Sequence, residues 1–184
     1  MLYLGLESIN PETLKQYNKK QSPEDVKNAV KALHDHGIEV YGMFVLGSDF
    51  DTKDTVTQTR EFAQSMDIDF TQFAASTPLP GTELRREMLE QDRIFNNNWD
   101  YYDLNHVVFT PKLIEPYVLQ VEILDAFKKF YSFTRSLVLF TAGRFWQWMN
   151  NGFARLYVRR WERENEEYLE YLEKVAAGKA PSSI

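Results

Sequence analysis

The chain of 184 residues contains no cysteine, which excludes disulfides, thiolate metal sites and a cysteine nucleophile within it. Its net charge of -6 argues against a general nucleic-acid binder, because neutralising phosphates needs clustered Lys and Arg. No apolar run approaches the ~20 residues of a membrane-spanning helix. The three histidines form no set with metal-ligand spacing. What remains is the composition of an ordinary globular protein, 43% hydrophobic and 26% charged.

Strand and helix patterns alternate along the first ninety residues. The apolar segments 2–7, 38–46 and 69–75 have the length and composition of buried strands. Helix patterns lie between them, and strands separated in this way pair in parallel through right-handed crossovers. The sequence therefore predicts an α/β fold with a parallel sheet.

Helix boundaries are marked by capping residues. Gly37 is placed to end the second helix as a residue of left-handed conformation. Beyond residue 92 the alternation stops, and residues 114–140 and 144–176 each have the pattern of one long helix. From Gly178 onward a frayed tail is expected. The predicted N-caps are Asn10, Ser22, either Asp51 or Thr52, and Thr82.

Three segments carry candidate chemistry. The first, Gly5-Leu6-Glu7-Ser8, places a carboxylate and a hydroxyl at the carboxyl end of a strand, where α/β folds bind ligands. Glu7 could accept hydrogen bonds from two ribose hydroxyls; alternatively it lies in water and Ser8 starts a turn. The second segment ends at Gly47, which permits a tight turn and a close backbone approach. Asp49 and Asp51 follow as helix caps or ligand contacts, and capping is favoured for Asp51.

The third segment, Thr77-Pro78-Leu79-Pro80-Gly81-Thr82, forms a rigid loop after the last predicted strand. Such a loop is a structural turn or the rim of a pocket. In this order and spacing the three segments resemble the second half of the catalytic domain of radical S-adenosylmethionine enzymes. The continuation Gly47-Ser48-Asp49-Phe50-Asp51-Thr52 and the Trp99–Asp103 segment are similar to the branch that carries an N-terminal cobalamin-binding domain.

This resemblance implies a partial (β/α) barrel to which the chain supplies the last three β/α units. It further implies that Glu7 and Ser8 approach the ribose of S-adenosylmethionine. Phe44, Leu46 and Gly47 would form the bed for the adenine, with help from residues 73–77, that is Phe73 and Thr77. No catalytic or metal-binding residue is assigned in this chain.

The family's three cluster-binding cysteines have no counterpart here. We therefore expect the chain to be the back half of a longer enzyme, with its missing N-terminal half as partner. That half would supply the 4Fe-4S cluster and, in this branch, cobalamin. The parent enzyme would perform methyl transfer or a rearrangement on a small-molecule or lipid substrate, and this chain alone is expected to be inactive.

The expected organisation is residues 1–92 as barrel, 93–135 as barrel-closing loop and helix, and 136–184 as a helical aromatic and basic extension. Two alternatives stay open. One is a non-catalytic α/β binding module. The other is a cytoplasmic protein whose residues 136–163 contact an acidic membrane surface, against which core packing of the helix pair is the favoured interpretation.

Overall fold

Three parallel strands form one sheet in the computed structural model, which describes residues 1–178. They are β1 (Leu2–Glu7), β2 (Val40–Leu46) and β3 (Phe70–Ala75), in the order β1-β2-β3. Leu2 pairs with Val40, and the register between β1 and β2 shifts between Gly5 and Glu7. The predicted parallel sheet is confirmed.

The helices of the N-terminal half begin at the predicted caps. They are α1 (Pro11–Gln16), α2 (Pro23–Asp35) and α3 (Lys53–Ser65) between the strands, and α4 (Glu83–Glu90) after β3. Asn10, Ser22 and Thr82 each accept a hydrogen bond from a backbone N–H of the first turn. Thr52 is the cap of α3, because its hydroxyl accepts from the Thr55 N–H. Gly37 follows α2 with a φ of +70°, as its position predicted.

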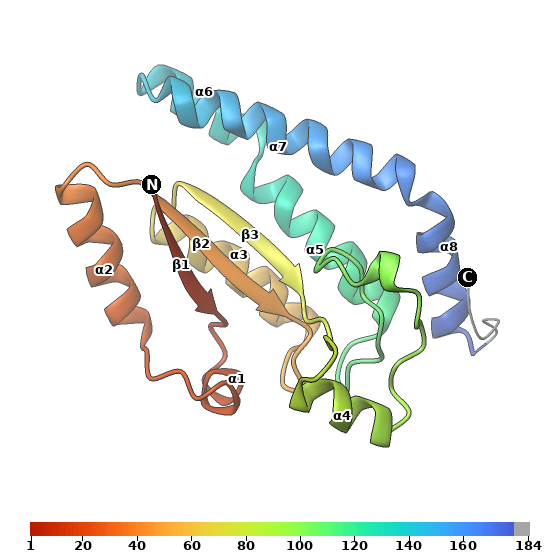
Figure 1. Cartoon of the computed structure of the whole chain (residues 1–184). Coiled ribbons are helices and arrows are strands. Elements are labelled where there is room, and N and C mark those ends of the chain that lie inside the picture. The colour runs from red at the N-terminus through yellow and green to blue at the C-terminus, as the bar shows by residue number, and fades with distance from the viewer. Residues whose placement is uncertain (179–184) are drawn as a thin grey trace.

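One face of the sheet is packed under helices, with α3 behind it in the view of Figure 1. On β2 every second side chain is buried, and this set includes Phe44 and Leu46. They join one core with apolar side chains of α2, α3 and α5, namely Val26, Val30, Val56, Ala63, Leu119 and Ile123. This face is the main source of hydrophobic stabilisation in the chain.

The other face of the sheet carries a row of aromatic rings. Tyr3 stacks on Tyr41 at 4.8 Å, and Tyr41 on Phe70 at 6.4 Å, both between ring centroids. Tyr3 is exposed, whereas Phe70 is buried. Burial raises the pKa of Tyr41, with smaller contributions from the neighbouring Tyr3 and Tyr157 hydroxyls. Since Phe70 of β3 is buried and Tyr3 of β1 is exposed, this face is covered at β3 and open at β1.

The C-terminal region is helical and differs from the prediction in its breaks. It comprises a short 3-10 helix (Trp99–Tyr101) and then α5 (Pro116–Phe130), α6 (Phe133–Thr141), α7 (Phe145–Glu164) and α8 (Glu166–Ala176). The predicted helix 114–140 is interrupted at Tyr131 and Ser132, where Ser132 caps α6. The predicted helix 144–176 is interrupted at Asn165. Residues 179–184, most of the expected tail, lie outside the described residues.

Two polar contacts attach these helices to the sheet. The Tyr131 hydroxyl accepts from the Thr71 N–H and donates to the Thr71 carbonyl, both at 2.8 Å, at the outer edge of β3. Asp69, directly before β3, accepts from the Val40 N–H at 2.9 Å and forms an ion pair with Arg144. Among the described helices, none is both long and apolar enough to cross a membrane.

Candidate functional site

The carboxyl ends of the three strands meet at one edge of the sheet, beside α1 and α4 (Figure 1). All three predicted ligand segments follow strands that end here: Glu7 and Ser8 after β1, Gly47 after β2, Ser76 and Thr77 after β3. In parallel α/β sheets this edge is where ligands bind. We therefore treat it as the candidate site.

Glu7 directs its carboxylate toward the open face of the sheet. Its φ of +58° is unusual for a residue with a side chain and follows the shift of register in β1. A Cβ on Gly5 would lie 2.7 Å from Glu7 Oε1, so glycine at position 5 makes room for the carboxylate. Lys19 Nζ lies 3.1 Å from the same oxygen. The side chain keeps a quarter of its surface exposed and can accept further hydrogen bonds.

Ser8 and Thr77 are bound within their own loops. The Ser8 hydroxyl accepts from the Asn10 N–H at 3.0 Å, and the Thr77 hydroxyl donates to the Ala75 carbonyl at 3.0 Å. Both residues are buried. They hold the loop backbone at the strand ends, and in these positions they offer a ligand little of their hydroxyl groups.

The three apolar residues of the predicted adenine bed belong to the helix-covered face. Phe44, Leu46 and Phe73 are each almost fully buried in the core. Phe44 stacks on Phe73 with centroids 5.8 Å apart. Their side chains therefore support the site from the core. A ligand at the strand ends could reach only the backbone of these residues.

Gly47 turns the chain away from β2 with a φ of +98°. A Cβ at this position would lie 2.7 Å from Leu119 Cδ2, which no side chain can tolerate without movement. The turn is held by Asp51, whose Oδ2 accepts from the N–H groups of Gly47 at 3.0 Å and Ser48 at 2.9 Å. Burial raises the pKa of Asp51, against the lowering effect of these hydrogen bonds.

Asp49 lies in the same loop and is fully engaged in ion pairs. Its two oxygens lie 2.6 Å from Arg93 and 2.6 Å from Lys112. Partial burial would raise the pKa of Asp49, but hydrogen bonds from the two cations outweigh it and leave the pKa lowered. Asp49 and Asp51 thus build the loop between β2 and α3 and do not cap α3.

Tyr17 follows α1 and was not predicted as a site residue. Its hydroxyl lies beside that of Ser76, at the end of β3. Burial raises the pKa of Tyr17 to about 12, and the nearby carboxylates of Asp51, Glu7 and Asp49 add to this. Tyr17 thus remains a neutral hydroxyl at pH 7, between the ends of β1 and β3. The only sequence feature that indicated this part of the site was Ser76, which directly follows β3.

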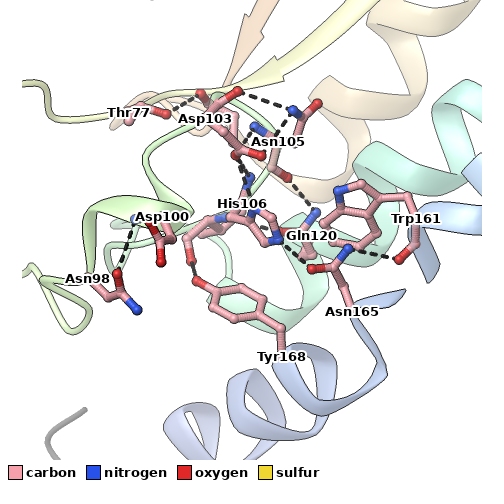
Figure 2. A network of polar contacts seen from close by, with 12 residues as sticks. Thr77, Asn98, Asp100, Asp103, Asn105, His106, Gln120, Trp161, Asn165 and Tyr168 are labelled. Atoms are coloured by element: carbon pink, nitrogen blue, oxygen red, sulfur yellow. Dashed lines mark hydrogen bonds and ion pairs between the residues drawn. The ribbon is translucent and has the colours of Figure 1, made fainter. Parts of the chain in front are cut away.

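The loop between the 3-10 helix (Trp99–Tyr101) and α5 is fastened to the C-terminal helices by the polar network in Figure 2. His106 is buried, and its ring nitrogens lie 2.9 Å from Asp103 Oδ1 and 2.8 Å from Asn165 Oδ1. The Tyr168 hydroxyl donates to the Val107 carbonyl at 2.8 Å. Because both ring nitrogens are engaged, His106 serves to hold this loop beside the site.

The site does not supply ligands for an iron-sulfur cluster. The chain has no cysteine, and within residues 1–178 no group of three His, Cys, Asp or Glu side chains could hold a metal. What the site does provide is an acceptor at Glu7, a hydroxyl pair at Tyr17 and Ser76, and a backbone opened by Gly47. This set suits a polar organic ligand with hydroxyl groups.

Comparison with known proteins identifies the N-terminal region. Residues 1–63 match the sequence model of the Radical SAM superfamily, which confirms the resemblance from β1 through most of α3. The matched region contains Glu7, Ser8 and Gly47. It does not extend to β3 or the C-terminal helices.

The chain is also similar to curated methyltransferases and to a cyclase. Bacteriochlorophyllide d C-12(1)-methyltransferase of Chlorobaculum tepidum is 36% identical over 61% of this chain and 24% of its own length. An uncharacterized methyltransferase of Pyrococcus horikoshii is 34% identical over 55% of this chain and 22% of its own. An anaerobic magnesium-protoporphyrin IX monomethyl ester cyclase of Cereibacter sphaeroides is 27% identical over 84% and 24%. The chain thus spans about a quarter of the length of these relatives.

Proposed function

Since residues 1–63 are radical SAM superfamily sequence, we propose that this chain forms the C-terminal part of a radical S-adenosylmethionine catalytic domain. Its strand ends would line part of the S-adenosylmethionine pocket. The observation that carries the proposal is Glu7, which combines a position inside the matched region with a carboxylate aimed at the open face. A carboxylate in this place suits the two hydroxyls of a ribose.

The proposed roles divide between side chains and backbone. Glu7 would accept hydrogen bonds from the ribose hydroxyls, and its ion pair with Lys19 would keep the carboxylate in place. The neutral hydroxyl of Tyr17 would donate a hydrogen bond to the ligand. The backbone at Phe44, Leu46 and Gly47 would support the adenine, and the buried Phe73 and Thr77 would fix the loop beside it.

Radical chemistry at this pocket would need an iron-sulfur cluster whose cysteine ligands come from another stretch of polypeptide. A 4Fe-4S cluster with S-adenosylmethionine supplies one-electron, hydrogen-abstracting chemistry when bound. Thiolates for that cluster must come from outside this sequence, because the sequence has none. We accordingly propose that the chain acts together with a cysteine-bearing N-terminal half, and that alone it does not turn over.

The reaction class follows from the relatives. Two of those named above are methyltransferases and one is a cyclase. We therefore propose methyl transfer or a rearrangement on a substrate of the bacteriochlorophyllide or magnesium-protoporphyrin kind. Cobalamin is proposed on the resemblance of the Gly47–Thr52 and Trp99–Asp103 segments to that branch, although Asp49 and Asp51 serve the loop itself.

The test is a titration of the full chain with S-adenosylhomocysteine, followed by backbone amide chemical shifts. This method registers weak binding to an incomplete pocket. Shifts should move at Glu7, Gly47 and Thr77 and stay still at the opposite strand ends. Glu7→Gln should weaken the response, whereas Glu24→Gln, an exposed residue of α2, should leave it unchanged.

Two results would refute the proposal. Shift changes confined to other parts of the chain would remove the pocket assignment. Formation of 5′-deoxyadenosine by the chain alone, supplied with iron, sulfide and a reductant, would show that it needs no cysteine-bearing partner. A non-catalytic binding module would instead show a ligand response that Glu7→Gln does not alter.

A further inference from the structure

Exposed apolar side chains gather on α6 and α7, which lie together along the top of Figure 1. We call this surface the α6–α7 face. Its most exposed members include Phe133, Phe140, Phe145, Trp146, Phe153 and Leu156, each at least half exposed. Isolated exposed apolar residues are normal, but a contiguous patch of them marks a surface that is covered in use.

Core packing accounts for one side of α7 and not for the other. Val158 and Trp161 are buried against Leu124 of α5. Phe145, Met149 and Leu156 follow the helical repeat on the opposite side and are exposed. Between α6 and α7 the surface is hollowed into a groove of about 460 Å³. The outward apolar side is thus left unpacked by the described residues.

The sequence of this region is basic, although Lys128, Lys129 and Arg144 form ion pairs with Glu162, Asp125 and Asp69. Between Asp125 and Glu162 the sequence holds seven Lys or Arg and no Asp or Glu, although the whole chain carries -6. Arg155 lies over the ring of Phe133, 5.5 Å from its centroid, and also lines the groove. Arg159 and Arg160 follow on the next turn and are exposed, and Arg160 forms a solvent-exposed ion pair with Glu164 at 2.7 Å. An apolar face bordered by arginines is the pattern of helices that lie on anionic bilayers.

We propose that the α6–α7 face docks on the surface of an anionic lipid bilayer. The aromatic and aliphatic side chains enter the boundary between headgroups and acyl chains, and Arg155, Arg159 and Arg160 meet lipid phosphates. Both helices lie along the surface, because no described helix is long and apolar enough to cross it. A second copy of the chain or a protein partner could also cover the apolar groups. Neither would explain why the sequence between Asp125 and Glu162 contains basic residues and no acidic ones.

The test is co-sedimentation of the full chain with two kinds of vesicle. One consists of phosphatidylcholine, and the other of equal parts of phosphatidylcholine and phosphatidylglycerol. The chain should sediment with the anionic vesicles and remain in solution with the neutral ones. Phe145→Ser/Leu156→Ser should weaken binding by at least about tenfold, because two exposed apolar side chains are lost. Arg159→Gln/Arg160→Gln should weaken it about thirtyfold, at about 1 kcal/mol per charge.

The matched control is Leu89→Ser/Leu113→Ser, which replaces two exposed leucines outside the α6–α7 face. This variant should bind anionic vesicles like the parent. Circular dichroism confirms that each variant is folded. Equal binding to both kinds of vesicle, no binding to either, or equal loss in the control would overturn the proposal. Concentration-dependent self-association without vesicles, abolished by Phe145→Ser/Leu156→Ser, would assign the face to a second copy and also overturn it.

Discussion

Gly47 leaves β2 with a left-handed backbone while Leu119 of α5 packs against its α-carbon. Two physical requirements therefore coincide at one residue. The backbone conformation disfavours any L side chain, and the packing leaves no room for a methyl group. This close approach brings α5 down onto the strand end and keeps the backbone beside the candidate site uncovered.

Replacing Gly47 with alanine should lower the free energy of unfolding by about 2–4 kcal/mol, as strain and overpacking add. Gly81→Ala is the matched control. It shares a positive φ of +78° but has no atom within 4 Å of the added methyl group. The control should lose about 1–2 kcal/mol from conformation alone. Urea unfolding of both variants measures the difference, and equal losses would show that contact with Leu119 contributes nothing.

The same scale explains what the sequence could not show about the candidate site. In residues 38–46 both faces of the strand are apolar, so the sequence did not show which face the helices cover. The family resemblance implied that Phe44 and Leu46 form a bed for the adenine, and the structure places their side chains in the core. For Glu7 the face of the sheet did not have to be predicted. A charged residue at the carboxyl end of a strand is expected at the ligand-binding edge whichever face the helices cover.

At the scale of elements, helix starts followed local rules and helix breaks did not. Ser22 and Thr82 cap their helices through contacts to residues three positions away, so sequence reveals them. At the two breaks, Asn165 contacts His106, 59 residues distant, and Tyr131 contacts Thr71, 60 residues distant, while Ser132 caps α6 by the same local rule as the other caps. The apolar stripe continues across both breaks, which is why single long helices were predicted there.

Tyr131 contributes a testable element of stability. Replacing it with Phe keeps the buried ring but leaves the Thr71 N–H and carbonyl without the hydroxyl that bonds both. Unfolding free energy should fall by about 1–3 kcal/mol, because unsatisfied buried polar groups are costly. Tyr3→Phe, at an exposed ring on β1, should change it by less than about 0.5 kcal/mol. Similar values for both variants in urea unfolding would contradict this role of the hydroxyl.

At the scale of the whole molecule, Asp69 joins parts that are distant in sequence. Its buried carboxylate contacts His34 of α2, the Val40 N–H of β2 and Arg144 before α7. The helical region that carries the α6–α7 face is thereby tied to the sheet that carries the candidate site. The parallel sheet was predictable from alternation alone, but this junction was not, since each member is an ordinary polar residue in sequence.

Asp69→Ala should lower the unfolding free energy by about 3–5 kcal/mol, because it leaves the partners of a buried charge unpaired. Asp67→Ala removes an exposed carboxylate 3.6 Å from the same arginine. That control should cost no more than about 1 kcal/mol. Thermal unfolding followed by circular dichroism compares the two, and a loss in Asp67→Ala as large as in Asp69→Ala would refute the special position of Asp69.

The Tyr131 hydroxyl also limits how many strands can join this sheet. It occupies the backbone of β3 at Thr71, and Leu104 accepts from the Ala75 N–H farther along the same strand. The opposite border, β1, begins with the exposed Leu2 and Tyr3. Each molecule therefore has one sheet edge, β1, to which another strand can pair. Edge-to-edge association stops at a dimer, because Tyr131 and Leu104 block the β3 edge through which a fibre would have to grow.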